Sequence, residues 1–428
     1  MSSTTYTADA PRSSTLLPMI IIGVLFFIFG FVTWLNGPLI SFVKVAFALD
    51  DISAFLVPFA FYVSYFVLAL PAGVVLKRTG MKKGMALGLF IMAIGAAVFG
   101  EFVRMRIYPG ALVGLFVIGA GLSLLQTASN PYISILGPID SAAQRIAFMG
   151  ICNKVAGALA PLTFGALVMT GIDSFQDRVA KTAVGPAREA LLNEFASRVF
   201  LPYMAMAGLL VVLAIWIVLS PLPEIKPSGA NSERAIGHRS GGIFSFPHLW
   251  LGVLCLFLYV GVEVMAGDAI NTYGQGFGLP LQVTSHFTTY TMLAMLTGYI
   301  FGLVLIPRFI SQQRYLAVSA VLGVLFAIGA YVTHGYVSVA FVAALGFANA
   351  MMWPAIFPLA IKGLGSHTEL GSALLVMGIV GGALLPQAFV HLKQYIDFQL
   401  AFVIVIVPCY LYILYYGMRG HAVGNRAG

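Results

Sequence analysis

Residues 17–45 read LPMIIIGVLFFIFGFVTWLNGPLISFVKV, and the single charged residue among them, Lys44, stands next to the end of the stretch. About 20 apolar residues are enough for a helix to cross the roughly 30 Å hydrocarbon core of a bilayer. The stretch is too long for the apolar segment of a cleaved signal peptide, and no small-residue cleavage site follows it. It therefore predicts a membrane-spanning helix that is retained in the protein.

The whole chain shares the composition of this stretch. Of its 428 residues, 60% are hydrophobic and 9% are charged, and the mean hydropathy is +0.95. A soluble domain carries about 25% charged residues, so most of this chain could not face water. The composition excludes an ordinary cytosolic enzyme, a disordered scaffold and a nucleic-acid-binding domain, although the net charge is +8.

Eleven further apolar stretches of similar length predict an all-α membrane protein with twelve transmembrane helices in two pseudo-symmetric six-helix bundles. The first bundle is assigned to residues 17–219 and the second to 247–417. The polar remainder is assigned to a cytoplasmic linker (220–246) and two cytoplasmic tails (1–16 and 418–428). The predicted spans are 17–45, 53–76, 84–103, 110–136, 145–170, 199–219, 247–274, 284–307, 315–333, 336–361, 369–391 and 398–417.

The two halves repeat each other weakly. Pro131 in the fourth span matches Pro354 in the tenth, and the tripeptide Met-Gly-Ile occurs at 149–151 in the fifth span and at 377–379 in the eleventh. Two six-helix halves that form a parallel repeat are typical of transporters in which one bundle rocks against the other.

Lysine and arginine predict the orientation. They cluster after the second span, at Lys77, Arg78, Lys82 and Lys83. With this loop inside, about twice as many basic residues lie on the cytoplasmic side as outside, which is the bias expected of cytoplasmic loops. Both termini are then cytoplasmic in a multi-pass protein of the cell inner membrane, and the mixed-charge loop 171–198 lies outside, where we expect a short surface helix.

Three charged residues fall inside predicted spans, away from their ends: Lys154, Glu263 and Asp268. An ionisable group in the bilayer interior is costly and is a functional candidate by default. One interpretation is that an acid carries a proton or sodium as the site changes sides. Glu263, the deeper acid, is preferred, Asp268 comes second, and Lys154 tunes them. The other interpretation is that Lys154 only neutralises a buried acid.

Amide side chains recur on particular helix faces. Gln126 and Asn130 are four residues apart and share one face of their span, as do Asn349 and Trp353. Amides both donate and accept toward sugar hydroxyls, and an aromatic face stacks on the ring. The alternative for any single amide is a helix–helix hydrogen bond of about 0.6 kcal/mol. The predicted sugar-binding residues are Asn36, Gln126, Asn130, Asn153, Asn271, Asn349 and Trp353.

Cysteine and histidine spacing indicates no disulfide and no zinc site. Cys152, Cys255 and Cys409 lie in apolar runs without paired spacing, and no two histidines stand three or four residues apart. We expect no cofactor besides a coupling ion, H⁺ or Na⁺. A carboxylate with amide and carbonyl oxygens around it suits sodium, whereas a lone carboxylate suits a proton.

Four motifs carry a resemblance to a known family: FGFVT at 29–33 with LN at 35–36, QTASNPY at 126–132, LGP at 136–138 and YVG at 259–261. Together they resemble the fucose/proton symporter family of the major facilitator superfamily, through nearly all twelve spans. Segments 33–39 and 149–161 look closest to its bacterial N-acetylglucosamine permease branch, with the glucose/galactose branch next. The resemblance implies the major facilitator fold and cation-coupled monosaccharide uptake by alternating access.

Two positions depart from the family pattern. In the fucose symporter an acid follows the Leu-Asn pair of the first helix, and here that position is Gly37. The acid before the Thr-Ala-x-Asn-Pro run is replaced by Gln126. Both expected proton carriers are missing, so we predict that Gln126 contacts the sugar and that any coupling has moved to Glu263 or Asp268.

The leading hypothesis is a sugar:cation symporter, with N-acetylglucosamine favoured and glucose/galactose or fucose next. The second is an uncoupled facilitator, because both family acids are absent. A membrane-embedded enzyme or a non-transporting sugar sensor would need a catalytic His/Cys/Asp cluster or an output domain, and the sequence shows neither. We predict a monomer that is not an enzyme, with a small sugar and membrane lipid as partners and no nucleic acid.

Overall fold

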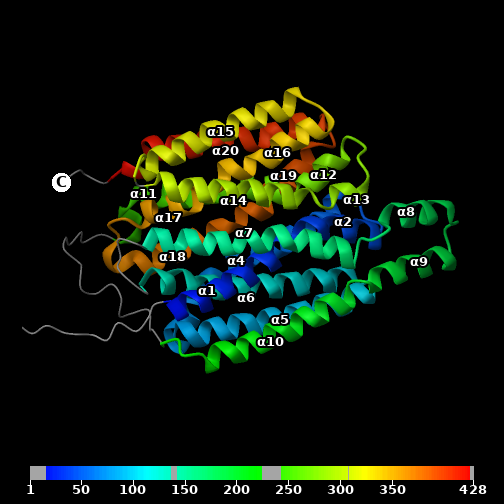
Figure 1. Ribbon diagram of the computed structural model, residues 1–428, viewed down its shortest axis with the longest axis horizontal. Helices are drawn as coiled ribbons and strands as arrows, with labels where there is room; N and C mark the ends of the chain where they lie inside the picture. Colours follow the sequence, from blue (N-terminus) through cyan, green and yellow to red (C-terminus); the bar gives the residue numbers. More distant parts are fainter. Residues whose placement is uncertain (1–15, 136–141, 224–241, 307, 425–428) are drawn as a thin grey trace, which may run out of the picture.

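The computed structural model describes residues 16–135, 142–223, 242–306 and 308–424, which fold predominantly into helices (Figure 1). Twelve segments of the described chain are helical, long enough and apolar enough to cross a membrane. The prediction of an all-α, twelve-span membrane protein is therefore confirmed. The predicted tails 1–16 and 418–428 and the linker 220–246 lie largely or partly outside the described residues, so the domain boundaries stay a prediction.

The first half of the chain, called the N-terminal bundle, consists of α1 (Leu16–Trp34), α2 (Asn36–Ala46), α3 (Asp51–Ala54), α4 (Leu56–Thr79), α5 (Met81–Arg104), α6 (Tyr108–Ile135), α7 (Ala142–Leu167), α8 (Ile172–Lys181), α9 (Pro186–Ser197) and α10 (Phe200–Leu219). The second half, called the C-terminal bundle, consists of η3 (Ile243–Ser245), α11 (Pro247–Gly267), α12 (Ile270–Gln275), α13 (Leu281–Thr284), α14 (Phe287–Leu305), α15 (Gln312–Val332), α16 (Gly335–Asn349), α17 (Met352–Ile361), η4 (Gly365–His367), α18 (Thr368–Met377), η5 (Gly378–Val380), α19 (Gly381–Leu392), α20 (Phe398–Met418) and η6 (Gly420–Ala422).

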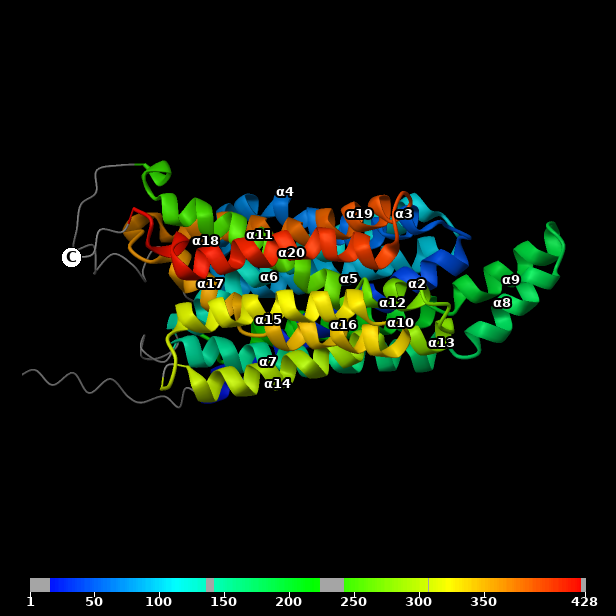
Figure 2. The same ribbon diagram turned by 90° about the horizontal axis from the view of Figure 1, so that it is seen from above.

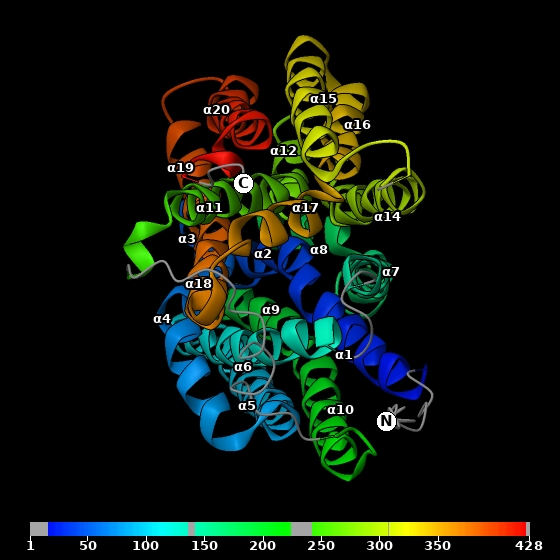
Figure 3. The same cartoon turned by 90° about the vertical axis from the view of Figure 1, so that its left-hand side faces the viewer.

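The two bundles lie side by side and share a long interface. Helix α7 runs along α14, and α4 runs along α18 and α19, as the end-on view in Figure 3 shows. Helix α1 begins and α20 ends at the same end of the molecule, on the left of Figure 1, which we call the terminal end. The opposite end, from which α8 and α9 project, is called the hairpin end (Figure 2).

Glycines allow the helices to approach closely within a bundle. A Cβ on Gly88 of α5 would lie 2.7 Å from the carbonyl oxygen of Gly121 in α6, and a Cβ on Gly121 would lie 2.4 Å from that of Gly88. No side chain fits at such distances. Small residues at membrane helix crossings let the backbones approach and gain van der Waals contact.

The first, seventh, tenth and eleventh spans, which the hydropathy predicts as continuous helices, are each interrupted along their length, the eleventh by the 3₁₀ turn η5. The first breaks at Leu35, between α1 and α2, two residues before the Gly37-Pro38 pair. Pro38 lies instead in the first turn of α2, where a missing backbone N–H leaves no helical bond unmade. The tenth span breaks between α16 and α17, at residues 350–351.

The seventh span is interrupted at Asp268. The backbone N–H groups of Asp268 and Ala269 both donate to the carbonyl of Val264, at 2.7 and 3.2 Å, so the turn is widened there before α12 begins. Widened turns of this kind inside helices are frequent at functional sites. The break separates Glu263, on α11, from Asn271, on α12, which the sequence placed on one continuous helix.

The mixed-charge loop 171–198 forms two helices, α8 and α9, rather than the single short helix that we expected. Arg106 anchors this hairpin to the N-terminal bundle: its side chain donates to the carbonyl of Ala46 at 2.9 Å and pairs with Glu189. Asp173 at the start of α8 accepts a hydrogen bond from the backbone N–H of Gln282 at 3.2 Å. The hairpin therefore contacts both bundles.

Candidate functional site

A cavity lies between the bundles and extends from mid-membrane toward the terminal end. It contains about 780 Å³ of empty space, including its mouth. Ile146, in the second turn of α7, lines its outer part, and Glu263 and Trp34 lie at its inner floor. Of the sequence-predicted site residues, the cavity brings together Gln126, Asn130, Asn153, Lys154, Glu263 and Trp353.

An ion pair crosses from one bundle to the other at the floor of this cavity. Lys154 Nζ, midway along α7, lies 2.9 Å from Glu263 Oε1 on α11, and the two side chains are 7% and 11% exposed. The same ammonium lies 4.4 Å from the centre of the Trp34 ring, within the range of a cation–π interaction. Two of the three interior charges thus neutralise each other, and Trp34 adds a third partner.

The amides of the N-terminal bundle are held by neighbouring side chains. Asn153 Oδ1 accepts from the indole N–H of Trp34 at 3.3 Å, and the Gln126 side chain donates to the hydroxyl of Tyr65 at 3.1 Å. These contacts orient the amides and leave further donors and acceptors for a ligand, because each amide can make several hydrogen bonds. The hydroxyl of Thr33, which also lines the cavity, has no hydrogen-bond partner among the described residues.

Aromatic side chains form much of the cavity wall, and the sequence did not single most of them out. Four buried tyrosines take part: Tyr62, Tyr65, Tyr259 and Tyr299. Tyrosine in membrane helices usually gathers at the two interfaces with water. A tyrosine in the middle of a span is therefore the signal that could have identified them.

Four predicted residues lie outside the cavity lining. Asn349 accepts from the hydroxyl of Tyr410 at 2.8 Å, within the C-terminal bundle. The break between α16 and α17 separates it from Trp353, although the two are four residues apart. Asn36, Asn271 and Asp268 are each 1% exposed and lie on the hairpin side of the cavity floor.

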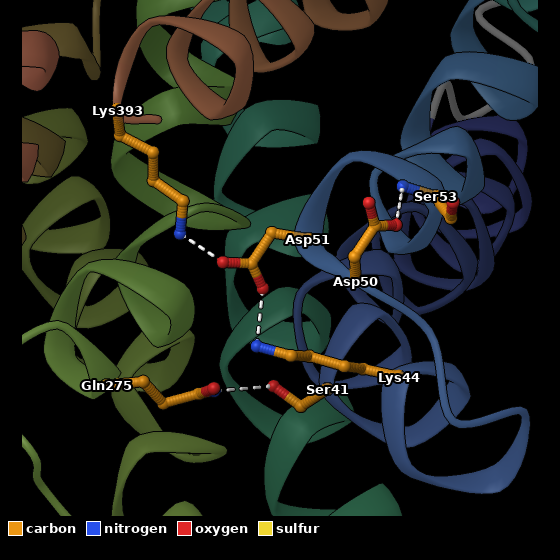
Figure 4. A network of polar contacts seen from close by, with 7 residues as sticks. All are labelled: Ser41, Lys44, Asp50, Asp51, Ser53, Gln275 and Lys393. Atoms are coloured by element: carbon orange, nitrogen blue, oxygen red, sulfur yellow. Dashed lines mark hydrogen bonds and ion pairs between the residues drawn. The ribbon is translucent and has the colours of Figure 1, made fainter. Parts of the chain in front are cut away.

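The hairpin end of the interface is closed by a group of side chains that we call the rim network (Figure 4). Asp51, at the start of α3, pairs with Lys44 at 2.5 Å and with Lys393 of the other bundle. Beside them, the side chain of Gln275 donates to the hydroxyl of Ser41 at 3.2 Å, again between bundles. Hydrogen bonds and ion pairs join the bundles at the Lys154–Glu263 pair and at several places on its hairpin side.

The described residues hold no cluster of three or more His, Cys, Asp or Glu side chains that could bind a metal ion. The cavity therefore offers hydrogen bonds, aromatic faces and one ion pair. Such groups bind a polar ligand and let it go again. Two helix bundles around a central polar cavity, with broken helices beside it, define the class of secondary transporters that alternate access between two sides of a membrane.

The comparisons with known proteins agree with this class. The family model of the Major Facilitator Superfamily matches residues 22–386, and the chain belongs to this superfamily. It is 34% identical over 401 residues to the glucose/galactose transporter of Brucella abortus biovar 1 (strain 9-941), covering 93% of this chain and 92% of that protein. It is 30% identical over 383 residues to the L-fucose-proton symporter of Escherichia coli (strain K12), covering 88% of this chain and 87% of that protein.

Solved structures share the fold. The crystal structure of the transporter FucP in its outward conformation superposes with a TM-score of 0.75 at 26% identity, covering 96% of this chain and 100% of that chain. The D-xylose-proton symporter, at 14% identity, has a TM-score of 0.67 and shares the fold alone. The predicted resemblance to the fucose/proton symporter family is confirmed, and the relatives are transporters rather than enzymes.

Proposed function

We propose that this protein takes up a monosaccharide together with a cation, by alternating access to the central cavity. The observation that carries the proposal is the division of the cavity between the bundles. The N-terminal bundle supplies the amides of Gln126, Asn130 and Asn153, and the C-terminal bundle supplies Trp353 and Glu263. A sugar held by amides on one side and an aromatic face on the other contacts both bundles and couples their movement.

N-acetylglucosamine is the favoured sugar, followed by glucose or galactose and then fucose. The resemblance of segments 33–39 and 149–161 to the N-acetylglucosamine permease branch supports this choice. Phe26 and Phe29 line the cavity with Asn153. An acetamido group would find an apolar contact for its methyl group there and an amide partner for its carbonyl. The relatives named for glucose, galactose and fucose support the other sugars.

We assign coupling to the interior carboxylates, Glu263 and Asp268. Glu263 sits at the floor of the cavity, in an ion pair that must break if the bundles separate at that point. Its protonation would remove the attraction to Lys154 and ease that separation. The name of the L-fucose-proton symporter supports a proton as the coupling ion, while the residues around Asp268, discussed below, favour sodium.

An uncoupled facilitator is the second candidate, and one observation favours it. Lys154 neutralises Glu263, so the cavity floor carries no net charge when both are ionised. A sugar could then move down its gradient without an ion. The assignment to symport therefore depends on a measurement of accumulation.

Uptake into proteoliposomes tests the proposal. Labelled N-acetylglucosamine, glucose, galactose and fucose are offered in turn, under a proton gradient, a sodium gradient or none. Symport predicts accumulation above equilibrium with one gradient, and equilibration without accumulation would establish the facilitator. If none of the four sugars enters, sugar transport is refuted. Glu263→Gln and Asp268→Asn should lose accumulation and keep exchange, whereas the surface variant Glu101→Gln should keep both.

We further propose that the protein is a monomer surrounded by lipid in the cell inner membrane, with both termini in the cytoplasm. The predominance of Lys and Arg in the loops of the terminal end supports this orientation. A C-terminal reporter that is fluorescent only in the cytoplasm should be bright. A dark reporter on a correctly inserted protein would reverse the orientation.

A further inference from the structure

A second polar group lies behind the cavity floor, between the floor and the rim network. Three side chains of the C-terminal bundle, Asp268, Asn271 and Thr288, surround Gly37 of α2 in the N-terminal bundle. We call these residues, together with the adjacent Asn36, the Gly37 cluster. All four side chains are at most 1% exposed, and none of them lines the sugar cavity.

Polar atoms in this cluster lack partners among the described residues. They are Asp268 Oδ1, Asn271 Nδ2 and Asn36 Nδ2. Leaving a buried polar atom unpaired costs about 1–3 kcal/mol. Native proteins pair such atoms with the protein, an ordered water or an ion. The unpaired carboxylate oxygen of Asp268 needs a proton, a water or a cation, and the two amide nitrogens need an acceptor unless their amides turn over.

Gly37 lets polar atoms of the C-terminal bundle approach α2 closely. A Cβ at this position would lie 2.4 Å from Thr288 Oγ1 and 3.3 Å from both Asp268 Oδ1 and Asn271 Nδ2. The polar atoms of three side chains thus converge on the space beside a residue that has no side chain. Any other residue would fill this space and press against Thr288.

The charge of Asp268 is not balanced in the way that the charge of Glu263 is. Glu263 has Lys154 at 2.9 Å, whereas Asp268 accepts a hydrogen bond from the hydroxyl of Tyr62 at 3.4 Å. A carboxylate buried without a counter-charge is costly. A proton or a bound cation would remove that cost.

The surrounding groups favour a metal cation over a proton, because all of them can present oxygen. Thr288 donates to the carbonyl of Gly267 at 2.7 Å, so its hydroxyl lone pairs remain available. Asn271 Oδ1 now lies 3.4 Å from that hydroxyl. If the amide turns over, its oxygen faces the space beside Gly37 and its nitrogen donates to Thr288. Hard cations prefer such oxygen donors, whereas a proton would need the carboxyl group alone.

We propose that the Gly37 cluster is a sodium site, separate from the sugar cavity and formed only when the bundles meet at the hairpin end. Asp268 supplies the charge, and Thr288 and the turned amide of Asn271 supply neutral oxygens. Because Gly37 and Asp268 belong to different bundles, sodium stabilises the arrangement in which they meet. The role of this ion in transport rests on the proposed sugar symport, but its binding does not.

Binding of radioactive sodium to the purified full-length protein in detergent, without sugar, tests the site. We expect saturable binding of about one ion per chain, which an excess of unlabelled Na⁺ displaces and choline does not. Asp268→Asn should abolish it, and Gly37→Ala and Asn271→Leu should each weaken it about tenfold or more. Glu194→Gln removes an exposed carboxylate of α9 and should bind as the wild type does.

Two results would overturn the site. One is the absence of saturable sodium binding in the wild-type protein, which would assign the cluster to water or a proton. The other is wild-type binding in Asp268→Asn. Size-exclusion profiles and thermal unfolding check that each variant is folded. If Asp268→Asn does not fold, Asn271→Leu decides, because it removes a ligand without removing a charge.

Sodium binding and sugar transport can be lost independently, so the two proposals are tested separately. Sugar accumulation driven by protons, with no sodium binding, would refute the sodium site and leave sugar symport standing. Sodium binding that Asp268→Asn abolishes, in a protein that moves none of the four sugars, would refute sugar transport and leave the site standing.

Discussion

The two halves of the bundle interface differ in how they hold the bundles together. On the terminal side of the Lys154–Glu263 pair, the bundles face each other across a cavity lined by amides and aromatic rings. On the hairpin side, they are joined by the Gly37 cluster, by Gln275 with Ser41, and by Asp51 with Lys393. The same pair of bundles thus encloses a cavity in one half and is joined by polar contacts in the other.

This difference indicates which contacts must be lost when the molecule changes state. A transporter that alternates access has to open the hairpin end and close the terminal end. The polar contacts of the hairpin half contribute little where they are exposed to water, and they are costly to break where they are buried because a charge is then left unpaired. The contacts nearest the membrane centre should therefore dominate the energy of the change. We therefore expect substitutions to have smaller effects on stability and transport the farther they lie from the membrane centre.

Substitutions in the Lys154–Glu263 pair should have the largest effect on stability and uptake. Removing one member of a buried ion pair leaves the other charge alone and costs about 3–5 kcal/mol. Lys154→Met should lower the thermal stability of the protein in detergent and abolish uptake. Glu263→Gln should lower the stability less, because the Lys154 ammonium retains its cation–π interaction with the Trp34 ring.

The double variant Lys154→Met/Glu263→Gln should be more stable than Lys154→Met alone, since no lone charge remains. Glu101→Gln breaks the exposed ion pair with Arg104 and serves as the matched control. It should change stability by at most about 1 kcal/mol. Single variants at Lys154 and Glu263 that unfold at the wild-type temperature would show that the pair contributes nothing to the closed interface.

A substitution in the cavity lining should have the next largest effect, on the KM for the transported sugar. Trp353→Ala removes the aromatic face that we assign to the sugar ring, and should raise KM for the transported sugar about tenfold. The maximal rate should change less, because the ion pair and the rim network remain intact. Trp216→Ala, on a residue of α10 that is 39% exposed, is the control and should leave KM unchanged. Equal KM values for the two variants would remove Trp353 from the site.

The rim network should have a smaller effect. Asp51→Asn removes the charge that holds Lys393 of the other bundle, so the hairpin end should open more often. We expect labelling of Gln275→Cys by an impermeant maleimide to rise about fivefold, which corresponds to about 1 kcal/mol. Asp50→Asn removes the neighbouring charge without touching a contact between bundles, and its labelling should match that of the parent protein.

The smallest effect is local and depends on pH. Asp50 caps α3 by accepting from the backbone N–H of Ser53 at 2.9 Å, and hydrogen bonds from Ser53 lower the pKa of this carboxyl below its usual value. A depressed pKa in the folded state means that the stabilisation is present at neutral pH and is lost as the pH falls through it. Hydrogen exchange of the Ser53 amide should therefore be faster in Asp50→Ala than in the wild type at neutral pH. In acid the two should converge.

The architecture was largely predictable from the sequence, because hydropathy alone determines which segments cross a membrane. The interior charges Lys154, Glu263 and Asp268 were found in the same way, since a charge in an apolar run is conspicuous. Their pairing was not predictable. Lys154 meets Glu263 because α7 and α11 pack across the interface, and nothing in either segment specifies the rotation of one helix relative to the other.

Helix breaks explain most of what the sequence did not predict. Asn349 and Trp353 were placed on one face by the helical repeat, but the break at residues 350–351 separates them. The widened turn at Asp268 has the same effect on Glu263 and Asn271. Pro354 is the signal of the interruption at 350–351, because it has no N–H to donate to the carbonyl of Ala350, but the helical repeat was applied across it. The cavity tyrosines were missed because each lies in a run of apolar residues that reads as lipid-facing or packing.

The hairpin of α8 and α9 offers a way to observe the molecule from outside. It is anchored to one bundle through Arg106 and touches the other through Asp173 and Gln282. When the bundles move apart at this end, the distance between hairpin and α13 must change, while the sugar cavity is left untouched. Fluorescent labels on these two elements would therefore report the distance between them during the transport cycle, in single molecules.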